Sequence, residues 1–337
     1  MKEVLSVIAD LVAGRPLGEA RAEAVLHALV EGQLTPAQAA AVLVAWRIKG
    51  ETVEELVGAV RAVRAHARAI APAGPLLDTC GTGGDQRHTF NVSTAAALVA
   101  AAAGVRVAKH GNRSASGFVG SADILEALGV RIDLPPERVQ AGIEELGFGF
   151  LFAPQFHPAM KNVAPVRREL GIRTIFNLIG PLANPAGAEH QLVGVFERRW
   201  LEPVARVLGQ LGARHVVVVH GCDGLDELSL SAPTDLVEWH EGRVQTQQVT
   251  PEDLGLPRRT LAELVCADLA EARRRMGEVL KGREGPCAEF TALNAGAALY
   301  VAGAVGSLAE GVTHAREVLA SGRAWEKLQQ IVAWSQA

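Results

Sequence analysis

Cysteine is scarce in this sequence, and its distribution excludes two kinds of site. The 337 residues include four cysteines, at positions 80, 222, 266 and 287, and no two of them form a Cys-x-x-Cys pair. This spacing argues against a disulfide framework or a zinc site and favours reduced thiols in the cytosol. Cys80 lies beside a glycine-rich turn, where a nucleophile is conceivable, but a small buried residue is the commoner role for such a cysteine.

The sequence also lacks an excess of positive charge and a long apolar run. Lys and Arg total 33 against 37 Asp and Glu, a net charge of −4, so any anion site must be local. The longest apolar stretch, residues 95–105, is well short of the roughly 20 residues that span a bilayer. Glu3 and Asp10 interrupt the start, where a signal peptide has a continuous apolar core. We therefore expect a cytoplasmic protein that binds neither nucleic acid nor membrane.

The first part of the chain has a purely helical pattern. Hydrophobic residues make up 49% of the sequence, enough to bury a large core. From residue 2 to about 66 they recur at helical spacing, which predicts four helices and no strand. Thr35 before Pro36, and Thr52 before acidic residues, are typical helix starts. The Pro- and Gly-rich segment 71–75 indicates a linker after this helical unit.

Beyond the linker, predicted strands alternate with predicted helices. The pattern indicates strands at 105–108, 149–153, 191–195 and 215–220, helices at 122–128, 136–146, 159–170 and 200–211, a hairpin or irregular edge at 238–244, and mainly helix from 261 to 334. Such alternation is typical of a parallel sheet between helices. The predicted fold class is α/β, with a small all-helical domain and a large α/β domain that has a mostly parallel central sheet covered by helices. We expect the small domain at 1–70 with a return segment at about 171–187, and the large domain at 75–170 and 188–337.

A glycine-rich turn between an apolar strand and an alanine-rich helix is the first candidate site. Gly81, Gly83 and Gly84 let backbone amides approach an anion, and the helix start at Ser93 and Thr94 offers further donors. The spacing matches neither the dinucleotide fingerprint nor the nucleotidase phosphate loop. Taken alone, the segment is equally consistent with a plain turn in an α/β protein.

Two further loops follow predicted strands. The segment 109–117, Lys-His-Gly-Asn-Arg-Ser-Ala-Ser-Gly, is rich in donors, and the segment 221–227 ends in Asp226 and Glu227. Ligands of open parallel sheets bind at the carboxyl ends of strands, so these loops and the glycine turn should converge. The first loop then favours an anion site, and the carboxylates are typical Mg²⁺ ligands beside a phosphate. A solvated turn and an ordinary acidic surface are the respective alternatives.

The predicted helix 159–170 is the fourth candidate element. Arg167 on this helix could bind a planar carboxylate, and Met160 could line an apolar slot. The same segment is equally consistent with an exposed helix whose arginines form salt bridges.

Together these motifs resemble the anthranilate phosphoribosyltransferase family. The resemblance rests on Asp-Thr-Cys-Gly-Thr-Gly-Gly-Asp at 78–85, Phe-Asn-Val-Ser-Thr at 90–94, Lys-His-Gly-Asn-Arg at 109–113, His-Pro-Ala-Met-Lys at 157–161, the segment 168–185 and Asp-Gly-Leu-Asp-Glu at 223–227. The motifs occur in the family's order and span nearly the whole chain. After Ser116 the family usually continues with a serine, a basic residue and a small polar residue, whereas Gly117-Phe118-Val119 stands here.

The resemblance implies transfer of the phosphoribosyl group of phosphoribosyl pyrophosphate to the amine of anthranilate, in tryptophan biosynthesis, with Mg²⁺. It also implies a homodimer joined through the helical domain. The residues implied to hold phosphoribosyl pyrophosphate are Gly81, Gly84, Asp85, Thr89, Asn91, Val92, Ser93, Thr94, Lys109, His110, Gly111, Asn112, Arg113, Ser114, Ala115, Ser116, Gly117 and Ser121. Those implied for anthranilate are Gly81, His110, Asn112, His157 and Arg167, with Asn112 and Arg167 as the catalytic pair; those implied for magnesium are Ser93, Asp226 and Glu227.

Two alternative functions remain at this stage. A pyrimidine nucleoside phosphorylase has the same architecture and related glycine and Lys-His loops, but it does not need the Asp226–Glu227 metal pair. A non-catalytic relative that binds nucleic acid is the other, against which the negative net charge and the intact carboxylates argue.

Overall fold

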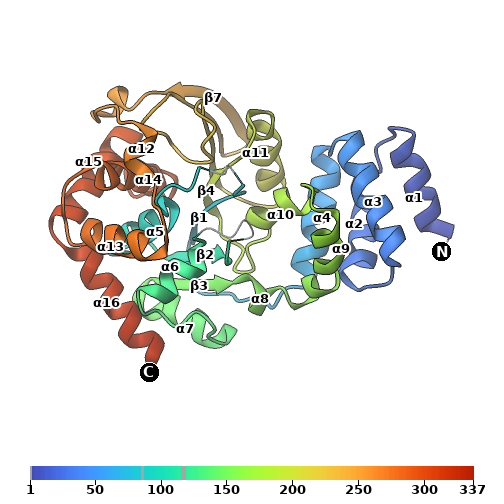
Figure 1. The fold of residues 1–337 in the computed structure, drawn as a ribbon, viewed down its shortest axis with the longest axis horizontal. Helices are drawn as coiled ribbons and strands as arrows, with labels where there is room; N and C mark the ends of the chain where they lie inside the picture. The colour runs from blue at the N-terminus through green and yellow to red at the C-terminus, as the bar shows by residue number, and fades with distance from the viewer. Residues whose placement is uncertain (1, 85–86, 115–118) are drawn as a thin grey trace.

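The N-terminal segment folds as a helical bundle, as its periodicity predicts. In the computed structural model, which describes residues 2–84, 87–114 and 119–337, the bundle consists of α1 Lys2–Val12, α2 Gly18–Val30, α3 Pro36–Lys49 and α4 Val53–Ala65. Capping boxes at Thr35 and Thr52 define the starts of α3 and α4. Figure 1 shows this bundle, in blue, at one end of the molecule.

Helices α2 and α4 run side by side in the same direction, and one glycine allows them to pack closely. Leu17 N donates to Glu55 Oε1 at 2.8 Å near their starts, and His27 meets His66 near their ends. Between these points, a Cβ added at Gly58 would lie 2.2 Å from the carbonyl oxygen of Glu19. Contacts below 3.0 Å with backbone atoms require the backbone itself to move.

Gly58→Ala should therefore destabilise the bundle although alanine is the better helix former. We expect the free energy of unfolding to fall by about 1–3 kcal/mol, the usual cost of overpacking. Gly277→Ala is the matched control, because Gly277 also lies within a helix and its added Cβ would only touch Trp325 at 3.8 Å. The control should be neutral or stabilising by up to about 1 kcal/mol. Urea unfolding of both variants measures the difference, and equal effects would contradict the close packing.

The rest of the chain is built on one sheet. Within the described residues its strand order is β3-β2-β1-β4-β5-β6-β7. The strands are β1 Leu77–Gly81, β2 Val107–Gly111, β3 Phe148–Phe152, β4 His190–Gly194, β5 His215–Gly221, β6 Thr234–His240 and β7 Arg243–Val249. The pairs among β1 to β5 are parallel, whereas β6 and β7 add in antiparallel fashion. The predicted α/β class and the predicted edge hairpin are confirmed.

Helices cover both faces of this sheet. Along β5, Val217 and Val219 belong to a core with the C-terminal helices, while Val216 and Val218 face a core that includes the N-terminal bundle. Figure 1 shows the C-terminal helices and the bundle on opposite sides of the strands. The helices outside the bundle are α5 Val92–Ala102, α6 Ser121–Ala127, α7 Pro136–Leu146, α8 Ala153–Phe156, α9 Ala164–Leu170, α10 Phe176–Leu182, α11 Leu201–Gln210, α12 Leu261–Leu264, α13 Leu269–Leu280, α14 Pro286–Val301, α15 Leu308–Ala320 and α16 Arg323–Gln336, with 3-10 turns η1 Pro158–Asn162, η2 Arg198–Trp200 and η3 Glu252–Leu254.

Two predicted elements are corrected by the structure. Strand β2 starts two residues later than predicted and continues through Lys109 and His110 to Gly111, because these residues pair with Phe150, Leu151 and Phe152 of β3. The predicted helix 159–170 is instead a 3-10 turn, η1, followed by α9. Pro165 has no backbone N–H to continue a helix across this boundary.

Segment α10 returns to the bundle. Leu178, Ile179 and Leu182 share the core of helices α1 to α4, and the Arg64 guanidinium of α4 donates to the Leu182 carbonyl at 2.7 Å.

Among the helices of the described residues, none is both long and apolar enough to cross a membrane.

Candidate active site

The glycine turn after β1 contacts the loop after β5. Gly83 N donates to Asp226 Oδ2 at 2.7 Å, and Arg87 donates to the Asp223 carbonyl at 2.6 Å. Strand β4 lies between the two loops in the sheet, and its last residue is a glycine because the Asp226 backbone presses against it. A Cβ added at Gly194 would lie 1.5 Å from the Asp226 carbonyl oxygen. The two loops therefore form one packed unit around Asp226, a residue that is 7% exposed.

The Lys109 side chain, on strand β2, also contacts this unit. Its Nζ donates to the Thr79 carbonyl at 2.5 Å and lies 3.5 Å from Ser93 Oγ at the start of α5. Burial lowers the pKa of Lys109, while the nearby charges of Asp78 and Glu227 raise it. Gly83 and Asp226, in the loops after β1 and β5, and Lys109, on β2 just before its own loop, thus lie at one edge of the sheet, as the strand-end rule predicts.

A buried carboxylate accompanies Lys109. Asp78 accepts from His110 N at 3.1 Å and from Asn184 Nδ2 at 2.7 Å. Burial raises the pKa of Asp78 to about 6, against the opposing effect of Lys109. The same Asn184 amide also donates to the Ala108 carbonyl, so this network ties β1 and β2 to the segment after α10.

The residues that follow β2 are held by local contacts. Arg113 N donates to Asn112 Oδ1 at 2.8 Å, and the Arg113 guanidinium pairs with Asp123 and Glu126 at the surface. Ser121 Oγ donates to the Asn112 carbonyl at 3.3 Å. An added Cβ at Gly111 would meet Ser121 Oγ at 2.2 Å, so the strand end and α6 are in close contact. The predicted site residues Asp85, Ala115, Ser116 and Gly117, and Phe118 beside them, lie outside the described residues.

At the start of α5 some side chains are buried and others form contacts with neighbouring segments. Val92 and Thr94 are buried, so a ligand in the loop would reach their backbone and not their side chains. Asn91 Nδ2 donates to the Val119 carbonyl at 2.8 Å, and Thr89 forms a bridge with Val265. The Ser93 carbonyl accepts from Thr79 Oγ1 at 2.8 Å.

A pair of histidines lies between the sheet and the bundle. The rings of His110 and His157 are 5.0 Å apart, and both are buried. Burial lowers the pKa of His110 to about 3 and that of His157 to about 4, so both rings are neutral near pH 7. The charge of Arg64 acts on both rings in the same direction. Burial lowers the pKa of Arg64 itself to about 10.

Arg167 is a partly buried cation. Its guanidinium lies 5.2 Å from the centre of the Phe176 ring, and burial lowers its pKa. Within the part of the chain that the structure describes, Arg167 has no carboxylate partner, unlike Arg113. The nearby Arg173 donates to the Gly84 carbonyl and stacks on Phe196 at 4.3 Å. Met160 packs at the edge of the bundle core, as an apolar lining residue would.

The periodicity of the first 66 residues does not by itself predict a role for Arg64. A signal was present, because Arg64 follows the buried Val57 and Val60 at helical spacing and so places a cation on an apolar face.

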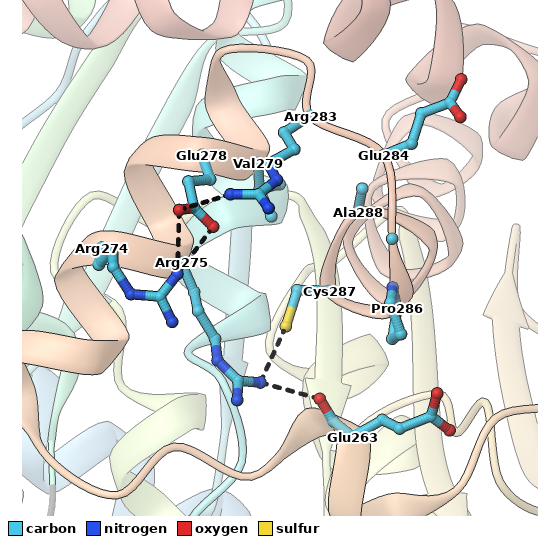
Figure 2. A pocket seen from close by; sticks show the side chains of 11 residues that line it. Glu263, Arg274, Arg275, Glu278, Val279, Arg283, Glu284, Pro286, Cys287 and Ala288 are labelled. Atoms are coloured by element: carbon cyan, nitrogen blue, oxygen red, sulfur yellow. Dashed lines mark hydrogen bonds and ion pairs between the residues drawn. The ribbon is translucent and has the colours of Figure 1, made fainter.

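A pocket of 210 Å³ elsewhere on the molecule is a weaker candidate. Figure 2 shows that Arg274 and Arg283 turn toward Glu278, and that Arg275 reaches Cys287 and the Glu263 carbonyl. Its arginines are neutralised by ion pairs with Glu271 and Glu278. This pocket, between α13 and α14, therefore has little charge left for an anionic ligand.

Comparisons with known proteins agree with this geometry. Residues 73–325 match the α/β domain model of a glycosyl transferase family, and residues 5–67 match that family's helical bundle domain. An anthranilate phosphoribosyltransferase of Thioalkalivibrio sulfidiphilus is 54% identical over 320 residues, 95% of each chain. The crystal structure of the Thermus thermophilus anthranilate phosphoribosyltransferase has a TM-score of 0.93 at 50% identity, over 98% of this chain and 99% of that one.

A more distant structure is the anthranilate phosphoribosyltransferase of Saccharomyces cerevisiae in complex with PRPP and Mg. Its TM-score is 0.91 at 27% identity, and the match covers 99% of this chain and 98% of that one. With both domain models matched and a relative above half identity along nearly its whole length, this chain belongs to the anthranilate phosphoribosyltransferase family.

Proposed function

We propose that this chain is a cytoplasmic enzyme of tryptophan biosynthesis that transfers the phosphoribosyl group of phosphoribosyl pyrophosphate to anthranilate. The products are N-(5-phosphoribosyl)anthranilate and pyrophosphate. Family membership supports the reaction, and one structural observation carries its location: the contact between Gly83 and Asp226, with Lys109 directly beneath. That edge of the sheet combines backbone donors, a buried cation and carboxylates, which a magnesium-bound diphosphate requires.

The donor set around Asp226 fits Mg²⁺. Asp226 and Glu227 are carboxylates, Ser93 adds a hydroxyl close to Lys109, and all three are the hard oxygen ligands that this ion prefers. We propose that these residues hold magnesium and that the glycine turn, the start of α5 and the residues 109–114 with Ser121 hold the phosphoribosyl pyrophosphate. When bound, the ion would neutralise charge that builds up on the departing pyrophosphate.

The acceptor would lie between His110, His157 and Arg167. Arg167 offers a guanidinium that has no carboxylate partner among the described residues and that matches a planar carboxylate, and the neutral histidines place no second positive charge beside the reacting amine. Arg64 would add to the attraction for an anionic acceptor from the bundle side.

The reaction needs positioning more than proton transfer. The C–O bond between the ribose anomeric carbon and pyrophosphate breaks, a C–N bond to the amine forms, and the amine releases one proton to the solvent. An aromatic amine is unprotonated near neutral pH, so no strong base is needed to prepare it. Lys109 and the backbone amides stabilise the leaving group, and Asn112 and Arg167 orient the acceptor.

Arg167→Ala should raise the KM for anthranilate by about 10- to 100-fold, since hydrogen bonds to charged groups contribute about 1.5–3 kcal/mol. The KM for phosphoribosyl pyrophosphate should change far less. Arg168→Ala is the matched control, because Arg168 is exposed on the same helix. Steady-state kinetics with each substrate varied in turn would test this, and equal changes in both KM values would refute the role.

The overall reaction is tested by mixing the protein with phosphoribosyl pyrophosphate, Mg²⁺ and anthranilate and following the loss of anthranilate fluorescence. Fluorescence loss that depends on both phosphoribosyl pyrophosphate and Mg²⁺ supports the transferase. Phosphorolysis of a pyrimidine nucleoside without a metal requirement would favour the phosphorylase instead.

We also propose a homodimer joined through the helical domain, taken as residues 1–70 with the return segment 171–187. In the described residues, Leu5, Val12 and Ile48 on α1 and α3 are large apolar side chains with 57%, 73% and 81% exposure. Helices α1 and α3 pack against each other, and large apolar side chains left exposed on two neighbouring helices favour a protein interface. Ile48→Glu should convert the dimer to a monomer in light scattering, whereas a wild-type monomer would contradict the proposal.

A further inference from the structure

Two histidines and a glutamate meet where α2 and α4 end, two residues beyond Arg64 on α4. His27 Nδ1 and His66 Nε2 are 2.8 Å apart, and His66 Nε2 lies 3.5 Å from Glu31 Oε1. One ligand atom from each of the three side chains falls within 4.8 Å of the others. Nitrogen and carboxylate oxygen atoms this close together are the first requirement of a metal centre.

The packing of the bundle creates this meeting point. His27 lies in the last turn of α2, Glu31 caps that helix, and His66 caps α4. Since α2 and α4 run in the same direction, their carbonyl ends, which carry partial negative charge, lie together. A cation placed between them is therefore favoured by both helices as well as by Glu31.

Outer contacts orient two of the three ligands. Glu23 Oε1 lies 3.7 Å from His27 Nε2, the ring nitrogen that faces away from His66. Gln33 donates to Glu31 Oε2, which leaves Oε1 directed at His66. Carboxylate and amide partners of this kind commonly fix the orientation of metal-binding side chains.

A second cluster of two histidines and one glutamate is less suited to bind a metal ion. His215 Nε2 is hydrogen-bonded to Glu238 Oε1 at 2.7 Å, and the same oxygen accepts from Tyr300 at 2.7 Å. His240 only stacks on His215, with ring centres 4.2 Å apart. Glu238 Oε1 thus already accepts two hydrogen bonds within the protein, whereas Glu31 Oε1 lies 3.5 Å from His66 Nε2, so this second cluster serves as an internal control.

We propose that His27, Glu31 and His66 bind one divalent transition-metal ion of the Zn²⁺ type, with water as the fourth ligand. Two imidazoles and one carboxylate suit Zn²⁺ and not Mg²⁺, which prefers oxygen ligands. The ion links the ends of α2 and α4 just before the chain leaves the bundle, where Arg68 N donates to the Phe156 carbonyl. It stabilises the bundle at the point from which the chain leads to β1.

The test is a zinc titration of EDTA-treated, dialysed full-length protein against a chromophoric zinc indicator, without substrates. Wild type should bind one more equivalent of Zn²⁺ than His66→Gln, at least tenfold more tightly than any residual site. His240→Gln and His314→Gln, which alters a half-buried side chain, should behave as wild type. Co²⁺ should give a visible absorption band in wild type that is lost in His27→Gln and His66→Gln.

Equal stoichiometry and affinity in wild type and His66→Gln would overturn the proposal, as would loss of the tight site in His240→Gln. Circular dichroism and the melting temperature without metal must show that His66→Gln is folded. Should it not fold, Glu31→Gln, which alters a partly exposed side chain, replaces it in the same titration and must weaken Zn²⁺ binding. Because no substrate is present, failure here leaves the transferase proposal intact.

Discussion

Asp226→Asn should lower kcat/KM for phosphoribosyl pyrophosphate by about 10²–10³-fold, the usual cost of removing one strong electrostatic contact to developing charge. The substitution keeps the side-chain oxygen that accepts from Gly83 N and so preserves the contact between the two loops. It removes the negative charge that would hold the cation. Most of the loss should therefore appear as a higher Mg²⁺ concentration needed for half-maximal rate, with the melting temperature nearly unchanged.

Asp223→Asn is the matched control for this substitution. Asp223 belongs to the same loop, but its carboxylate accepts from Ser229 and helps to hold the turn. Asparagine can accept the same bond, so the Mg²⁺ dependence of the control should stay at the wild-type value. If both variants required more Mg²⁺ to the same extent, the effect would come from the loop's shape, and the metal assignment of Asp226 would be wrong.

The convergence of the loops could be predicted from sequence because it follows from two local patterns. The runs at 191–195 and 215–220 are apolar enough to be buried strands, and helices between strands require parallel pairing. Parallel strands place their carboxyl ends on one edge, which predicts that the glycine turn and the Asp226 loop converge there, and the structure brings Gly83 and Asp226 into contact. The 1.5 Å approach at Gly194 could not be predicted, since it depends on how deeply the Asp226 backbone lies over β4.

Other details were decided by contacts distant in sequence. The sequence Lys109-His110-Gly111 resembles the start of a loop. In the structure, pairing with β3 makes these three residues the end of strand β2. The alternation of a strand then turns the Lys109 side chain inward. Arg64 reaches the two histidines only because α10 and α4 pack together, a contact between residues more than 100 positions apart. Periodicity describes which face of a helix is apolar and says nothing of which helix it meets.

The inward turn of Lys109 links catalysis to stability. The Lys109 residue is 1% exposed, and its ammonium lies over β1, where Asp78 is fully buried. Neither charge would be stable alone at this depth, and each shifts the pKa of the other toward its charged form. For the diphosphate that we propose binds there, a cation held in place under the glycine turn would already be oriented, so little reorganisation would be needed at that step.

Lys109→Met should cost about 3–5 kcal/mol of unfolding free energy near pH 8, because it leaves the Asp78 carboxylate buried without its cation. The pH dependence has a defined sign. The folded-state pKa of Asp78, about 6, already lies above the ordinary value of 3.8, and removing Lys109 raises it further. Stability tied to this group is fully present below about pH 4 and is lost as pH rises through the folded pKa. The deficit of Lys109→Met relative to wild type should therefore be small near pH 4 and should grow toward pH 8.

Urea unfolding between pH 4 and pH 8 measures this deficit, and Lys327→Met is the matched control. Lys327 Nζ also donates to a backbone carbonyl, that of Leu146, at 2.8 Å, and burial lowers its pKa, but no carboxylate partner is found for it in the described chain. Its replacement should cost about 1 kcal/mol with little dependence on pH. In the double variant Asp78→Asn/Lys109→Met the two losses should be less than additive, with a coupling of about 0.5–3 kcal/mol. A deficit for Lys109→Met that is the same at pH 4 and pH 8, together with additive losses, would mean that the two groups do not stabilise one another and that Lys109 is retained for substrate alone.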